Sequence, residues 1–146
     1  MRCSVIVPTY NRPQALKLCL LSLAQQSRLP DEVLIADDGS GQETKDVVIE
    51  MRDRLRDRFP IRHVWHEDNG FRKPEILNET VRQSTGNYLV FIDGDCIAHR
   101  HFVKSHIGRS EPDAVLGGKR VEIGRGLSER ITKDGKVYNA ASIRLL

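Results

Sequence analysis

The stretch Ser4–Arg12, with the sequence SVIVPTYNR, decides the fold class of this 146-residue chain. The run Cys3–Val7 is short, apolar and partly β-branched, which predicts a buried strand. The polar residues Pro8–Asn11 follow as a turn, and Pro13 is of a residue type favoured in the first turn of a helix. The chain therefore begins with a strand that runs through a polar loop into a helix.

The same order of strand, loop and helix recurs downstream. Val33–Ala36 predicts a second strand, and the polar turn Asp37–Gly41 leads into a helix whose apolar residues are three and four positions apart. Ile61–Trp65 predicts a third strand, followed by a helix that Pro74 opens and Gly86 is expected to cap. These repeated units indicate parallel strands joined by right-handed crossovers.

A fourth strand is predicted over Tyr88–Ile92, and its apolar character favours a central position covered on both faces. A short helix is expected around His101–Ile107, with further strands over Ala114–Leu116 and Lys119–Ile123. The predicted fold class is α/β, with an open, mainly parallel, twisted sheet and helices on both faces.

The chain is expected to contain one core domain over residues 1–123. From Gly124 the periodicity fades, so residues 124–146 are expected to form an irregular tail, the start of a further half that this chain lacks. The sheet edge and apolar face thus left open favour homo-oligomers, or loose packing around residues 138–146.

Composition narrows the class of protein. Hydrophobic residues make up 39% and charged residues 29% of the chain, as in an ordinary globular domain. The 23 basic and 20 acidic residues are interleaved, which disfavours nucleic acid as a partner. The net charge of +3 suits an anionic small ligand and leaves peripheral membrane association open.

The cysteines and the hydropathy indicate the cellular compartment of the protein. Cys3, Cys19 and Cys96 are too few and too scattered for a disulfide framework, which favours a reducing, cytoplasmic location. Neither a signal peptide nor a transmembrane segment is expected, because the apolar runs are far shorter than the roughly 20 residues of a membrane span.

Three polar clusters follow the predicted strands at their carboxyl ends, where open α/β sheets bind ligands. They are Pro8–Arg12, Asp37–Ser40 and Asp93–Asp95. No glycine-rich phosphate loop follows the first strand, so a divalent cation is the expected means of holding phosphates. Asp93 and Asp95, two apart in extended backbone, would point the same way and suit that role.

The residues of these clusters and their neighbours allow other interpretations. A phosphatase with an Asp-x-Asp nucleophile would carry its acidic pair after the opening strand, whereas here the pair follows the fourth strand. A zinc site at Cys96, His99 and His101 fits no standard spacing. Trp65 and Phe71 are candidates to stack on a base or sugar, although core packing is favoured for Trp65.

Three stretches occur in order along the chain: Ser4–Arg12, Ala36–Ser40 and Asn87–Asp95. Together they resemble the successive signatures of family-2-type glycosyltransferases, which have the nucleotide-sugar-binding, Rossmann-like GT-A fold. Gly70–Lys73 and Cys96-Ile97 are similar to the branch that includes bacterial chondroitin-polymerase-like enzymes. The resemblance covers about residues 2 to 123.

This resemblance implies metal-assisted, inverting transfer of a sugar from a UDP-sugar donor to a glycan or other hydroxyl acceptor. It implies donor-binding roles for the following residues: Pro8, Thr9 and Tyr10 border the nucleobase, Asp38 accepts from the base with Asp37 beside it, Arg72 lies over the base or phosphates, and Asp93 faces the ribose or sugar. Arg12 and Gly94 are also implied to bind the nucleotide sugar. Asp95 would ligate Mn²⁺ or Mg²⁺.

The general base is the part of the resemblance that the sequence leaves unassigned. Glu122, Glu129 and Asp134 are available carboxylates, but none lies in a matching motif, and a solvated surface position is favoured for each. The chain is therefore expected to be the donor-binding portion of a longer enzyme. A non-catalytic nucleotide-sugar-binding module remains the alternative, because it would share every donor contact.

Overall fold

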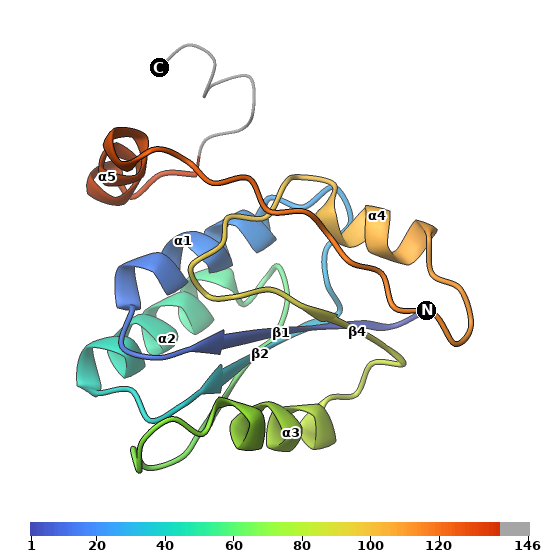
Figure 1. Ribbon diagram of the computed structural model, residues 1–146, viewed down its shortest axis with the longest axis horizontal. Coiled ribbons are helices and arrows are strands. Elements are labelled where there is room, and N and C mark those ends of the chain that lie inside the picture. Colours follow the sequence, from blue (N-terminus) through green and yellow to red (C-terminus); the bar gives the residue numbers. More distant parts are fainter. Residues whose placement is uncertain (138–146) are drawn as a thin grey trace.

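The computed structural model describes residues 1–137 and has an α/β fold (Figure 1). The elements follow in the order β1 (Cys3–Thr9), α1 (Pro13–Ala24), β2 (Glu32–Asp37), α2 (Gln42–Leu55), β3 (Ile61–Trp65), α3 (Lys73–Gln83), β4 (Tyr88–Phe91), α4 (Phe102–Gly108) and α5 (Arg125–Asp134). The predicted strand-helix order from β1 to β4 is confirmed.

The four strands form one parallel sheet in the order β3-β2-β1-β4. Helices α1 and α2 cover one face and α3 covers the other, as expected (Figure 1). After β1 the chain moves outward to β2 and β3, and it then returns to the other side of β1 as β4. The strand order thus reverses between β1 and β4, and open α/β sheets bind ligands at the carboxyl ends of the strands at such a point.

The core lies on both faces of β1 and β2, whose residues are all buried. Val5 and Val7 pack on the side of α1 and α2, whereas Ile6, between them, packs with Ile76 of α3. This alternation follows the two-residue period of a strand. The central strands are therefore apolar on both faces, as parallel strands covered by helices must be.

The predicted central position of β4 is wrong for the described sheet. β4 pairs with β1 along one side only, and Phe91 is half-exposed. Strand order is set by the crossovers that return the chain to β1, and an apolar composition does not determine it.

The strands predicted over Ala114–Leu116 and Lys119–Ile123 are also absent. That segment has no regular secondary structure, and the Val115 and Val121 side chains are 99% and 88% exposed. A strand needs a hydrogen-bonded neighbour and a buried face, and within residues 1–137 this segment has neither.

The expectation of an irregular chain from residue 124 is wrong for the ten residues of α5. Ile131 is buried, and Gly135 ends the helix in the left-handed conformation with its N–H donating to the Ile131 carbonyl. Leu127 and Ile131 are four residues apart and precede this glycine, which is the pattern of a short amphipathic helix. The domain boundary at residue 123 stays a prediction, and the expected loose packing at 138–146 lies outside the described residues.

Gly86 does not cap α3, which ends at Gln83 with Ser84 in an extended conformation. A Cβ at Gly86 would lie 2.4 Å from Ser4 Oγ, and the Gly86 N–H donates to that hydroxyl over 2.8 Å. Gly86 therefore brings the start of β4 against β1. Within residues 1–137 no helix has the length and apolar character needed to cross a bilayer.

Candidate functional site

A pocket of about 420 Å³ lies at the carboxyl ends of β1 and β4, at the reversal of strand order. Its lining comes from four segments of the chain: Pro8, Thr9, Tyr10 and Arg12; Asp38; Gly70, Phe71 and Lys73; and Asp93, Gly94, Asp95 and Arg120. Eight of the ten residues predicted for the site therefore meet in one pocket. Asp37 and Arg72 are not among the lining residues.

The Asp93-Gly94-Asp95 segment is held against the end of β1. The Ile92 N–H donates to the Ile6 carbonyl over 3.1 Å, and the Gly94 N–H donates to the Pro8 carbonyl over 3.0 Å. Gly94 and Asp95 form a turn, so the expected extended backbone is wrong. A Cβ at Gly94 would lie 2.8 Å from the Pro8 oxygen, so glycine is what permits this approach.

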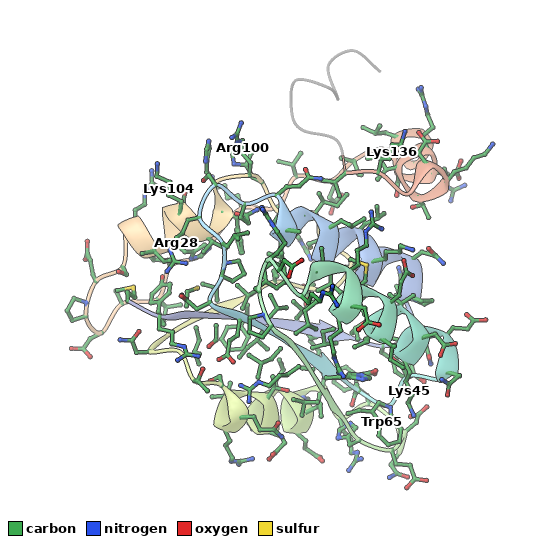
Figure 2. All side chains as sticks on the ribbon, turned by 180° about the vertical axis from the view of Figure 1, so that it is seen from behind. Arg28, Lys45, Trp65, Arg100, Lys104 and Lys136 are labelled. Carbon is green, nitrogen blue, oxygen red and sulfur yellow. The ribbon has the colours of Figure 1, made fainter. Side chains whose placement is uncertain are left out.

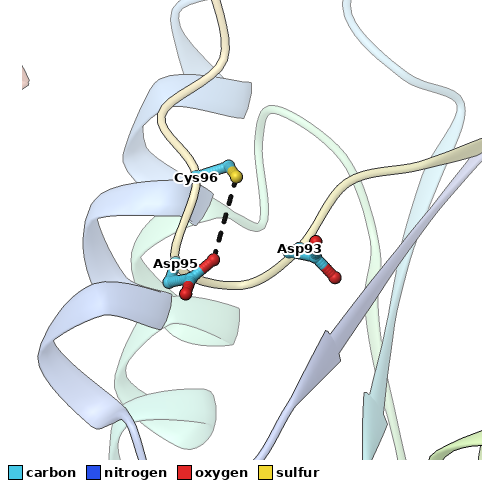
Figure 3. A group of neighbouring side chains, drawn as sticks. All are labelled: Asp93, Asp95 and Cys96. Carbon is cyan, nitrogen blue, oxygen red and sulfur yellow. Dashed lines mark hydrogen bonds between the residues drawn. The ribbon is translucent and has the colours of Figure 1, made fainter. Parts of the chain in front are cut away.

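The turn nevertheless brings both carboxylates together. Ligand atoms of Asp93, Asp95 and Cys96 all lie within 4.8 Å of one another (Figure 3). Burial, together with the negative charges of Asp95 and Asp93, raises the pKa of the Cys96 thiol. The Cys96 thiol, which lies 3.8 Å from Asp95 Oδ1, thus stays protonated, and two carboxylates remain as hard oxygen donors. This donor set fits Mg²⁺ or Mn²⁺.

The Thr9 hydroxyl is a polar group in the pocket lining that lacks a partner. Thr9 is 8% exposed, and its Oγ1 makes no hydrogen bond with the described residues. A Cβ at Gly94 would lie 3.5 Å from this oxygen, which places the hydroxyl beside the acidic turn. Buried polar groups are almost always hydrogen-bonded, so this hydroxyl indicates a ligand that supplies the missing partner.

Asp38 joins three loops at the pocket wall. Its Oδ1 accepts from His66 Nε2 over 2.7 Å, and its Oδ2 accepts from the Arg72 N–H, at the start of α3, over 3.1 Å. Its own N–H donates to the Thr9 carbonyl over 3.1 Å. These contacts hold an almost fully buried carboxylate in one orientation.

Asp37, the last residue of β2, is fully buried. Burial opposes its ionisation, but hydrogen bonds from His63 and from Ser40 outweigh burial and lower the pKa of Asp37. The His63 Nε2 to Asp37 Oδ2 distance is 2.8 Å. Asp37 thus supports the turn that presents Asp38. The Arg72 guanidinium points to Glu75 and the Glu67 carbonyl.

The aromatic side chains near the pocket differ in exposure. Phe71 is 82% exposed in the lining, and Tyr10 is half-exposed with its Oη donating to Asp68 over 2.9 Å. That hydrogen bond raises the pKa of Tyr10. The expected core packing of Trp65 is wrong, because Trp65 is 41% exposed and Lys45 lies 3.8 Å above its ring (Figure 2).

Two cations in the pocket are not predicted by the sequence pattern. Lys73 Nζ lies 2.9 Å from Asp93 Oδ1, and Arg120 Nη1 lies 3.8 Å from Asp93 Oδ2. Lys73 opens α3 and Arg120 belongs to the irregular segment before α5, so only the fold brings them to Asp93. Another cationic group, Arg28, Arg100 and Lys104, lies around α4, near the start of β1 (Figure 2).

Residues 4–142 match the profile of glycosyl transferase family 2. The chain belongs to this family. It is 38% identical over 120 residues to validoxylamine A glucosyltransferase of Streptomyces hygroscopicus subsp. limoneus, covering 78% of this chain and 26% of that protein. It is 31% identical over 105 residues to chondroitin synthase of Escherichia coli, covering 71% of this chain and 15% of that protein. The chain thus spans about a quarter or less of the length of these curated relatives.

Two solved structures share the fold. The mannosyltransferase PcManGT from Pyrobaculum calidifontis, in complex with GDP-Man and Mn²⁺, matches with a TM-score of 0.66 and 26% identity over 76% of this chain and 33% of its own. S. aureus TarS 1-349, in complex with UDP-GlcNAc, matches with a TM-score of 0.58 and 29% identity over 74% of this chain and 30% of its own. The expected GT-A fold and the family resemblance are confirmed.

Proposed function

We propose that this chain binds the nucleoside diphosphate sugar donor of a metal-assisted glycosyltransferase, and that the donor is a UDP-sugar. The observation that carries the proposal is the convergence, in one pocket, of the Asp93 and Asp95 carboxylates with the unpartnered Thr9 hydroxyl. Family 2 membership and the structures with GDP-Man and Mn²⁺ or with UDP-GlcNAc support it.

The pocket residues divide between the two ends of such a donor. Asp38, Tyr10 and Pro8 form the nucleobase end, where the Asp38 carboxylate accepts a hydrogen bond from the base. Asp95 holds Mn²⁺ or Mg²⁺, and Asp93 lies beside it toward the ribose and sugar. When bound, the ion supplies positive charge that stabilises the departing diphosphate. Thr9 lies beside the turn of Asp93 and Asp95, where its hydroxyl donates to the ribose or the diphosphate.

Transfer breaks the bond between the anomeric carbon and the diphosphate oxygen, which keeps the electron pair. The acceptor hydroxyl of a glycan attacks that carbon from the opposite face, with inversion, and gives its proton to a general base. Within residues 1–137, the carboxylates of the lining are Asp38, Asp93 and Asp95, and all three serve the donor in this assignment. The lining includes none of the three other candidates for the base, Glu122, Glu129 and Asp134.

This use of all three carboxylates favours a second candidate function, a module that holds the donor without transferring sugar. A transfer assay separates the two functions, because a binding module retains UDP affinity and gives product at background. Neither function requires a disulfide, and all three cysteines are free, which suits the cytoplasmic location that we infer.

Calorimetric titration with UDP, with and without Mn²⁺, tests the donor site. We expect Mn²⁺ to strengthen UDP binding by the wild-type chain, and Asp95→Ala to remove that gain while the circular dichroism spectrum stays unchanged. Asp57→Ala is the matched control, since the Asp57 side chain is 92% exposed and outside the lining. An Asp95→Ala variant with an unchanged Mn²⁺ dependence would contradict the metal assignment.

A further inference from the structure

Asp93 is the pocket carboxylate that two cations neutralise. Lys73 Nζ and Arg120 Nη1 lie 2.9 Å and 3.8 Å from its two oxygens. Among the described residues, the Cys96 thiol is the one group that donates a hydrogen bond to the neighbouring Asp95 carboxylate. The acidic pair is therefore asymmetric, with one carboxylate free for a cation and one already paired.

The charges of the pocket lining balance. Arg12, Lys73 and Arg120 supply three positive charges, and Asp38, Asp93 and Asp95 supply three negative charges. The diphosphate of a nucleotide sugar carries two negative charges, and a divalent cation cancels them. The pocket thus stays neutral with or without the donor and its metal, provided that the internal cations can exchange partners.

The ion pair of Lys73 with Asp93 is suited to such an exchange. The two side chains are 40% and 43% exposed, and exposed ion pairs are only weakly stabilising. Lys73 has a flexible stem and a compact ammonium with three donors, which can turn from one oxygen partner to another. It begins α3 on the wall of the pocket, so the exchange requires only rotation of the side chain.

We propose that Lys73 is a counter-ion that exchanges between Asp93 and the diphosphate of the donor. Before the donor binds, Lys73 holds Asp93 and opposes a free divalent cation at the acidic pair. When the donor and metal enter together, Lys73 donates to the diphosphate oxygens and releases Asp93 Oδ1 toward the ribose and sugar, while Arg120 remains beside Oδ2. This inference rests on the proposed donor site and adds the residue that couples metal binding to diphosphate binding.

Opposite effects on two ligands test the exchange. Lys73→Met keeps the length of the side chain and removes its charge. We expect it to strengthen Mn²⁺ binding in the absence of nucleotide by about two- to fivefold, measured by electron paramagnetic resonance, because a weak competing pair is lost. We expect it to weaken inorganic pyrophosphate binding in the presence of Mn²⁺ by about tenfold, measured by calorimetry, because a charge-assisted hydrogen bond is lost.

Lys17→Met is the matched control. Lys17 forms an ion pair of the same kind with Glu50, with Nζ 2.7 Å from Oε1, and lies outside the pocket. It should change neither affinity, and Lys73→Arg should keep both near the wild-type values. A loss of both Mn²⁺ and pyrophosphate affinity in Lys73→Met, or no change in either, would overturn the exchange. A wild-type chain that binds neither Mn²⁺ nor UDP would overturn the proposed function itself.

Discussion

Asp38 shows how far a single residue can be prepared for a ligand by its neighbours. Both of its oxygens already accept hydrogen bonds, one from His66 and one from the Arg72 N–H. Each carboxylate oxygen has room for two donors, so the group can still accept from a nucleobase. The neighbours therefore set the orientation of Asp38 and leave acceptor capacity toward the pocket.

Substituting Asp38 should affect the nucleobase end alone. We expect Asp38→Ala to weaken UDP binding by about tenfold, with and without Mn²⁺, through the loss of a charge-assisted hydrogen bond. Inorganic pyrophosphate affinity should not change. A circular dichroism spectrum of the variant checks that any loss is not caused by unfolding. Equal losses for UDP and pyrophosphate in calorimetry would instead assign Asp38 to the phosphate end.

The sequence predicts residues at strand ends well, because a strand end places a side chain by its position alone. Thr9, the last residue of β1, lines the pocket for that reason. Asp37 and Asp38 are adjacent, but the Asp37 carboxylate accepts from His63 and from the Ser40 N–H, and only Asp38 lines the pocket. Lys73 and Arg120 reach Asp93 through tertiary packing, which no local pattern encodes.

Among the helices and strands, those from β1 to α3 are predicted by the spacing of their apolar residues, because each of them buries an apolar face. The sequence pattern also predicts α4, and it fails after that helix, where Val115 and Val121 look like strand residues but have no neighbouring strand in the described fold. It also misses α5, a short helix that buries little more than Ile131. Apolar composition predicts burial only where a second element is available to cover it.

The junction of β1 with the turn after β4 depends on the absence of a side chain at Gly94. We expect Gly94→Ala to lower the free energy of unfolding by about 1 to 3 kcal/mol, because the new Cβ would meet the Pro8 carbonyl. It should also weaken Mn²⁺-dependent UDP binding, since Asp93 and Asp95 flank this position. Urea denaturation and calorimetry measure the two effects.

Gly118→Ala is the control for Gly94→Ala. A Cβ at Gly118 would meet no atom within 4 Å, so this variant should retain wild-type stability and UDP binding. Equal stability of the two variants would show that the turn can move away from β1 without cost.

In the molecule as a whole, the two ends of the sheet differ: one end carries the pocket, and the other carries a network of buried hydrogen bonds. The pocket occupies the carboxyl ends of the strands, whereas a buried network around Glu32 occupies the other end. Glu32 accepts from Ser4 Oγ over 2.6 Å, from the N–H and Oγ1 of Thr85 over 2.6 and 2.8 Å, and from Arg62 over 2.8 Å. One carboxylate thus ties β1, β2, β3 and the start of β4 together.

This network should control the acid stability of the protein. Burial opposes the ionisation of Glu32, but the hydrogen bonds from Ser4 and Thr85 and the charge of Arg62 lower its pKa from 4.5 to about 2. A group whose pKa is lower in the folded protein stabilises it fully above the unfolded value, and the stabilisation is lost as the pH falls from about 4.5 toward 2. The shift corresponds to about 3 kcal/mol.

We therefore expect Glu32→Gln to lower the free energy of unfolding by a few kcal/mol at pH 7, and to flatten the decline of stability below pH 4.5 that the wild-type protein shows. Urea denaturation from pH 7 to pH 2.5, followed by circular dichroism, measures both effects. Glu111→Gln is the control, because Glu111 is exposed in the segment after α4 and should leave the profile nearly unchanged. Mn²⁺-dependent UDP binding at pH 7 should survive Glu32→Gln wherever the variant is folded, since the network lies at the opposite end of the sheet from Asp95. A Glu32→Gln profile parallel to that of the wild type would mean that other carboxylates govern acid unfolding.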